Sequence, residues 1–135
     1  MFIKLIGIIT SLVILNQATG IGAEQMKYLT NIVKITLTQS ETDSIAHVVY
    51  TGKVIENDGR LPYLSEEEWA EYIRKQMESK AQNRDTSKDL WIKPYKIMEM
   101  DTVPGRSGPG FIVRSSGPDG SCETKDDIIS GYEYR

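Results

Sequence analysis

The sequence has very little cysteine and histidine. Among its 135 residues, Cys122 is the only cysteine and His47 the only histidine. A single cysteine excludes an internal disulfide, and one cysteine with one histidine cannot form a structural zinc site. A catalytic triad that uses histidine would have to be built around His47. We interpret Cys122 as a spectator, with an intermolecular disulfide partner or a packed thiol as the alternatives.

Positive charge is also in short supply. The chain has 16 Lys and Arg residues against 19 Asp and Glu residues, a formal net charge of −3, and no stretch in which Lys and Arg cluster. A nucleic-acid-binding surface needs such a cluster, so nucleic acid is not expected as a partner. The length is that of one domain with a modest core.

Long hydrophobic runs are absent except near the N-terminus. Residues 5–15 are largely apolar and follow Lys4, a pattern typical of a secretory signal. A spanning helix needs about 20 apolar residues, and Asn16 and Gln17 interrupt this run too early. We therefore predict that residues 1–23 are a signal peptide, cleaved after one of its last small residues. The alternatives are a retained N-terminal anchor or filament-core helix, and a buried helix. Residues 24–135 are the folded domain.

The first part of this domain is predicted to be a long helix. From residue 24 to about residue 50, apolar residues recur at steps of three and four, which indicates one buried helical stripe. A polar gap at residues 38–44 interrupts the stripe, so the helix frays or kinks there, or its other face carries it. Gly52 is the expected stop. Residues 57–62 (NDGRLP) then form a turn.

A second, shorter helix begins with a capping box. The Ser65 hydroxyl can accept from the amide of Glu68, while the Glu68 carboxylate reaches back to Ser65. The acidic first turn, residues 66–68, also suits the helix dipole, so we interpret it as capping rather than catalysis. An apolar stripe at steps of three and four follows, and the helix is expected to end near Ala81. Its members are Trp69, Tyr72, Ile73 and Met77.

Three strands are predicted after the helices. Residues 95–100 alternate in polarity and follow Pro94, which belongs at the start of a strand or at a sheet edge. Residues 111–114 and 132–134 are the second and third strands. Helices followed by strands predict an α+β fold, in which the N-terminal helix and a second short helix pack on a small three-stranded antiparallel sheet.

An acidic loop lies between the second and third predicted strands, at residues 116–128 (SGPDGSCETKDDI). It carries three carboxylates that can converge, from Asp119, Asp126 and Asp127. Calcium takes six to eight oxygen ligands in a flexible geometry, so carboxylates, carbonyls, hydroxyls and water together suit it. The neighbouring serines can supply further oxygens: Ser115, Ser116 and Ser121. The spacing does not match an EF-hand.

Other interpretations of this loop exist. The same pattern occurs in ordinary acidic surface turns. Magnesium is less suitable, because it prefers a rigid octahedral shell with retained water. A hydrolase with paired carboxylates at Asp126 and Asp127 is disfavoured, because adjacent side chains diverge and no nucleophile or base is placed beside them. The protein is therefore not expected to be an enzyme.

Several segments together resemble the globular domain of the major pseudopilin of the bacterial type II secretion system. Residues 57–62 are similar to the family's Asn-Gly-x-x-Pro segment. Residues 89–95 (DLWIKPY) keep the Asp, Trp, Pro and Tyr of its Asp-Pro-Trp-Gly-x-Pro-Tyr motif. Residues 116–120, followed by 126–128, resemble its C-terminal Ser-x-Gly-x-Asp-Gly…Asp-Asp-Ile segment. The matches run in order from about residue 24 to residue 128.

The resemblance implies a pilin-like, calcium-binding structural protein. Asp119, Asp126 and Asp127 would be the side-chain ligands, with Ser116 and nearby carbonyls completing the shell. The partners would be other pseudopilin or pilin-like subunits of a periplasmic pseudopilus that drives protein secretion. Localisation would be periplasmic or secreted, and anchored in the inner membrane only if residues 1–23 are retained.

The N-terminus departs from the family pattern. The family has a short basic leader and a Gly before the mature end, whereas here Phe2 follows Met1 directly. Ile6 stands where the family has the glutamate that pairs with a neighbouring subunit. This departure keeps a second hypothesis open. In that hypothesis the chain is a soluble exported calcium-binding module that binds a partner without forming a filament.

Overall fold

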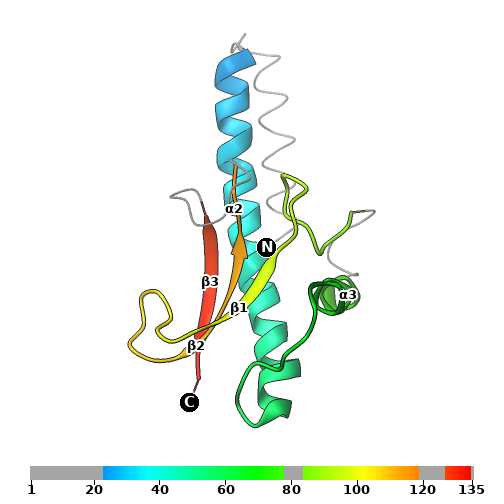
Figure 1. The fold of residues 1–135 in the computed structure, drawn as a ribbon. Coiled ribbons are helices and arrows are strands. Elements are labelled where there is room, and N and C mark those ends of the chain that lie inside the picture. Colours follow the sequence, from blue (N-terminus) through cyan, green and yellow to red (C-terminus); the bar gives the residue numbers. More distant parts are fainter. Residues whose placement is uncertain (1–22, 78–83, 119–126, 135) are drawn as a thin grey trace.

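A long helix crosses one face of a small antiparallel sheet in the computed structural model (Figure 1), which describes residues 23–77, 84–118 and 127–134. The helix is α2 (Ala23–Val49) and a shorter helix is α3 (Glu66–Met77). The strands are β1 (Lys96–Met100), β2 (Gly110–Ser115) and β3 (Ile128–Glu133), in the order β1-β2-β3. The fold is therefore α+β, as predicted.

The polar gap in the first helix does not break it. Residues 38–44 continue α2, and Thr38, Glu41 and Thr42 are buried. A hydrogen bond of 2.8 Å joins the hydroxyls of Thr42 and Ser130, and the Tyr95 hydroxyl donates to Glu41 at 2.6 Å. These polar side chains face the sheet and the segment before it, so fraying or kinking at this point was a wrong expectation.

The predicted stop at Gly52 was also wrong in detail. The α-helix ends at Val49, but the chain continues through a π-helical turn (Tyr50–Val54) and a 3-10 turn (Ile55–Asn57). Gly52 leaves room for Tyr72 here, because a Cβ on it would lie 2.1 Å from the Tyr72 hydroxyl oxygen unless that side chain moved. The reversal comes later, at Asp58, whose φ of 55° is left-handed.

The second helix starts as the capping box predicts. The Glu68 amide donates to the Ser65 hydroxyl, and the Ser65 amide donates to the Glu68 carboxylate, both at 3.2 Å. Such a cap contributes about 0.5–2 kcal/mol. The apolar stripe turns inward, with Trp69, Ile73 and Met77 buried. The expected end near Ala81 lies outside the described residues.

The third strand is longer than predicted. It begins at Ile128 rather than at residue 132, because Ser130 and Gly131, typical turn residues, belong to the strand. Gly131 is required there by packing: a Cβ would lie 2.7 Å from a methyl group of Val103. The register pairs Lys96 with Arg114 in the first hairpin and residue 115 with residue 128 in the second.

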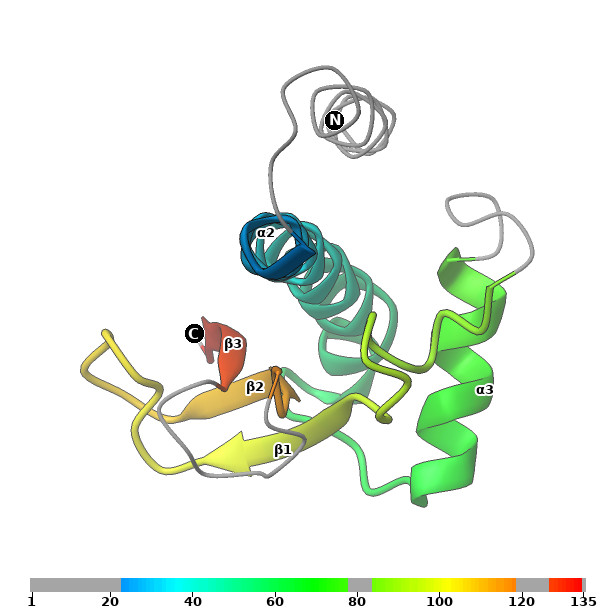
Figure 2. The ribbon, with the colours of Figure 1, turned by 90° about the horizontal axis from the view of Figure 1, so that it is seen from above.

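The core lies between α2, α3 and the sheet. Seen along the long helix in Figure 2, α2 covers one face of the sheet and α3 lies beside it. A large apolar side chain contributes about 1.5–3 kcal/mol to stability when it is fully buried in such a core. Residues 1–22 lie outside the described part, and none of the helices that are described is long and apolar enough to cross a membrane. The buried cluster contains Ile45, Ala46, Val49, Val54, Trp69, Ile73, Met77, Tyr95, Phe111 and Val113.

Candidate metal site

The acidic loop connects β2 to β3, as predicted. The last residue of β2, Ser115, pairs with the first residue of β3, Ile128, so the two ends of the loop are held side by side. Ser116 and Asp127 are the next residues outward, and the structure therefore brings these two predicted ligands to the same end of the sheet. Asp119 and Asp126 lie outside the described residues.

Asp127 is a buried carboxylate. Its side chain is 4% exposed, and its Oδ2 lies 3.3 Å from Nε of Arg114, a β2 residue. Two buried charges of opposite sign compensate the loss of solvent that each suffers. A cation bound in the loop would share the Asp127 carboxylate with the Arg114 guanidinium.

The start of the loop is fixed by Ser115. Its hydroxyl accepts a hydrogen bond from the Gly117 amide at 3.2 Å and donates one to the Asp89 carboxylate at 2.6 Å. Ser116, between them, is 5% exposed, and Gly117 has a left-handed φ of 72°. The backbone on this side of the loop therefore has one defined path, anchored to a residue from a different part of the chain.

Asp89 is the centre of this anchor. It is 2% exposed, and its Oδ1 accepts from the amides of Trp91 at 2.9 Å and Lys93 at 3.0 Å, while its Oδ2 accepts from Ser115. A carboxylate with three donors is well compensated for its burial. Asp89 thus holds the turn at residues 89–95 against the first residues of the acidic loop.

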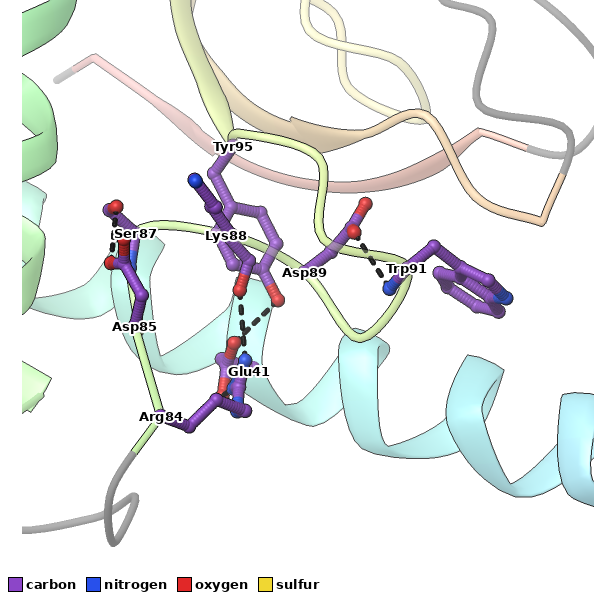
Figure 3. Close-up of polar contacts among 8 residues, drawn as sticks. All are labelled: Glu41, Arg84, Asp85, Ser87, Lys88, Asp89, Trp91 and Tyr95. Atoms are coloured by element: carbon purple, nitrogen blue, oxygen red, sulfur yellow. Dashed lines mark hydrogen bonds and ion pairs between the residues drawn. The ribbon is translucent and has the colours of Figure 1, made fainter.

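A third buried carboxylate, Glu41, lies on α2 beneath the same segment (Figure 3). It accepts hydrogen bonds from the Tyr95 hydroxyl and the Arg84 guanidinium, and Arg84 also donates to the Lys88 carbonyl at 2.8 Å. Burial, together with the negative charge of Glu41, raises the pKa of the Tyr95 hydroxyl far above its ordinary value. The arrangement is an anchor between α2 and the segment before β1.

The chemistry of the described residues is that of anchoring rather than of a complete ion site. In residues 23–77, 84–118 and 127–134, no group of three Asp, Glu, His or Cys side chains is placed to hold a metal ion. Two of the four predicted ligands, Asp119 and Asp126, and also Cys122, lie outside these ranges. The calcium site therefore stays a prediction.

Sequence reasoning missed the partners of the loop. Asp89 stands out in the sequence only through the resemblance of residues 89–95, and Glu41, which anchors the segment before β1 rather than the loop itself, lies in the polar gap. A useful signal was present, because polar side chains such as Glu41 and Thr42 inside an otherwise apolar helical stripe usually find buried hydrogen-bond partners when the helix packs, as both do here. Arg114, at the end of a strand next to an acidic loop, gave a similar signal.

Comparison with known proteins gives no significant match: no protein-family model, no curated protein and no solved structure matches this chain.

Proposed function

We propose that this protein is a non-enzymatic, pseudopilin-like structural subunit of a type II secretion or pilus-like machine, stabilised by a calcium ion in the loop at residues 116–127. The resemblance at residues 57–62, 89–95 and 116–128 suggests the family. The order of elements supports it: a long N-terminal helix, a short second helix, then three antiparallel strands.

The observation that carries the calcium proposal is the construction of the loop's base. Ser116 and Asp127 are both buried at the closed end of the β2–β3 hairpin, and Asp89 fixes the path of the backbone into the loop. Carboxylates gathered on such a loop repel one another unless a cation neutralises them. If only the folded chain gathers them, as the proposal requires, ion binding would add directly to the stability of the fold.

Thermal melting of the full chain in excess calcium and in excess chelator tests this site. At a calcium concentration 100 times the Kd, the expected gain is roughly 2.7 kcal/mol of unfolding free energy. The double variant Asp119→Ala with Asp126→Ala should lose the calcium-dependent part of the melting temperature. A matched control, Glu71→Ala with Asp101→Ala, removes two exposed carboxylates elsewhere and should keep it. Equal melting temperatures with calcium and chelator in the unaltered protein would rule the site out.

The second candidate, a soluble exported calcium-binding module, is favoured by one sequence feature. Ile6 stands where the pseudopilin family has the glutamate that pairs with a neighbouring subunit. Mass spectrometry of the mature N-terminus separates the two candidates. A chain that starts near Ile21 or Glu24 contradicts the filament subunit, whereas a methylated Phe2 or an intact apolar segment contradicts the soluble module. In either case the expected compartment is periplasmic or extracellular.

A further inference from the structure

A groove of about 590 Å³ lies on the N-terminal half of α2. Met26, Lys27 and Lys34 line it from the helix, and Trp91 and Pro118 line it from the two loops that Asp89 ties together. None of the described residues around it is acidic. Lys27 and Lys34 are two helical turns apart and so lie on one face of α2. With Thr30 and Asn31 as its remaining described lining residues, the groove combines a mainly apolar surface with two lysines, in a chain whose net charge is −3.

The Trp91 wall of this groove is held in a strained turn. Ile92 has a φ of 63°, a left-handed conformation that is an outlier for a β-branched residue, and its side chain is 75% exposed. The turn is maintained by the amide of Ile92, which donates to the Asp89 carbonyl at 3.1 Å, and by the amide of Asp89, which donates to Lys93 at 2.8 Å. Strain of this kind persists where the surroundings impose it, and it is common at binding sites.

A segment with complementary chemistry lies near the opposite end of the molecule. Tyr63 is fully exposed, although its neighbours Leu61 and Leu64 pack against the core. Glu66 and Glu67 follow on the exposed first turn of α3. This segment leads from the C-terminal end of the long helix to α3 (Figure 1), whereas the groove lies on the N-terminal half. The part of α2 from Lys34 to its end at Val49 rises about 22 Å along the helix axis.

We propose that the groove of one copy, lined by Lys27, Lys34 and Trp91, binds the Tyr63–Glu67 segment of a second copy. The Tyr63 ring enters the apolar groove beside Trp91, and the two glutamates face the two lysines. Lys27 is exposed and Lys34 is half-buried, so a carboxylate of a second copy can approach both ammonium groups. Large aromatic side chains are the usual anchors of protein interfaces. The partner is thus a second copy of this chain.

The geometry of such a contact favours chains of subunits over closed dimers. The two surfaces differ and lie at different ends of the molecule, so the contact is heterologous and leaves one free surface at each end. It rests on the proposed function, because it describes how a pilin-like subunit would meet its neighbour.

Site-specific photo-cross-linking tests the contact in the full chain. A benzophenone amino acid in place of Tyr63 should give an adduct of twice the chain mass, mapped to Trp91 or to residues 26–34 of a differently tagged copy. Lys27→Glu with Lys34→Glu should lower the yield about tenfold or more, because like charges then face each other. Glu66→Lys with Glu67→Lys should do the same, and mixing the two variants should restore the adduct between them.

A matched control makes the same change of charge at two lysines outside the groove. Lys75→Glu with Lys96→Glu alters two exposed lysines away from the groove and should leave the yield unchanged. An adduct that maps elsewhere, lies within one chain or joins an unrelated protein would overturn the proposal, and so would a yield unaffected by the charge swap. Formaldehyde cross-linking of the unaltered chain separates this failure from that of the proposed function. If it still gives a ladder of multimers, only this contact is wrong, and if it gives none, subunit assembly fails as well.

Discussion

At the scale of single residues, Ile92 departs clearly from ordinary backbone preferences, because a β-branched residue rarely has a φ of 63°. A left-handed φ costs about 1–2 kcal/mol for an L-residue, whereas glycine adopts it freely. The pseudopilin motif that residues 89–95 resemble has Gly at this place. The chain therefore keeps an exposed apolar side chain at the expense of backbone strain.

Replacing Ile92 with glycine should stabilise the fold. Relief of the strain outweighs the extra freedom that glycine has in the unfolded chain, so we expect a net gain of about 0.5–1 kcal/mol. Urea unfolding of the two proteins measures it. Lys93→Gly, one residue later and outside the left-handed region, should lose stability instead. A destabilised Ile92→Gly protein would show that the side chain makes stabilising contacts.

Burial of the Tyr95 hydroxyl should make the protein less stable at high pH. The pKa of this hydroxyl is raised by burial and by Glu41, so the folded state keeps a proton that the unfolded state releases above about pH 10. Stability should therefore fall by about 1.4 kcal/mol per pH unit above that value for this one group. Tyr95→Phe should lower stability at neutral pH by about 1–3 kcal/mol, because Glu41 loses a donor.

The stability of the Tyr95→Phe protein should fall less steeply with rising pH above about pH 10 than that of the unaltered protein. Urea unfolding at several pH values between neutrality and about pH 11 compares the two slopes, since the unfolded tyrosine titrates near pH 10. Tyr63→Phe is the control. The Tyr63 side chain is fully exposed, so the loss of its hydroxyl should change neither the stability at neutral pH nor its slope with pH. Parallel pH profiles for the unaltered protein and Tyr95→Phe would contradict this account.

At the scale of elements, Asp89 joins two loops that are distant in the sequence. Asp89→Asn keeps the shape but replaces one acceptor oxygen with an NH2 group and removes the charge. We expect a loss of about 1–3 kcal/mol, because a buried donor is left unsatisfied. The calcium-dependent rise in melting temperature should also shrink, since Ser115 and Gly117 no longer have a fixed position. Asp101→Asn, an exposed change of the same kind, should alter neither quantity.

Local features of the elements could be predicted because local physics decides them. The Ser65–Glu68 cap and the stripe at Trp69, Ile73 and Met77 depend only on residues three and four apart. The antiparallel sheet and the place of the acidic loop between its last two strands could be predicted from the succession of elements along the chain. The length of β3 did not, because Ser130 and Gly131 are placed in a strand by contacts with Thr42 and Val103.

The candidate site could be predicted only in outline. Three aspartates in a loop indicate a cation, but the residues that anchor the ends of the loop and the neighbouring segment come from other elements. Arg114 comes from β2, Asp89 from the segment before β1, and Glu41 from α2 beneath that segment. No spacing rule relates residue 41 to residue 95, so this network required the tertiary structure.

At the scale of the whole molecule, folding and contact between copies depend on different charges. The side chains of Arg114 and Asp127 are only 11% and 4% exposed, and salt screens such pairs little. The groove's Lys27 and the exposed Glu66 and Glu67 would meet at the rim of an interface, where the Debye length falls from about 10 Å at 0.1 M salt to about 3 Å at 1 M. The two processes should therefore respond differently to ionic strength.

We expect the adduct from position 63 to fall severalfold between about 0.1 M and 1 M sodium chloride, while the melting temperature in excess calcium changes by only a few degrees. The charge-swapped mixture should show the same salt dependence, because it restores the attraction with the signs exchanged.

Tyr63→Ala tests the contribution of the aromatic ring, in a chain that carries the photoprobe at Trp91. It should lower the yield of adduct at every salt concentration without altering the melting temperature, because this fully exposed ring contributes to contact and not to folding. A yield that is unchanged or rises with salt would show that apolar contact alone joins the copies, and the pairing of lysines with glutamates would then be wrong.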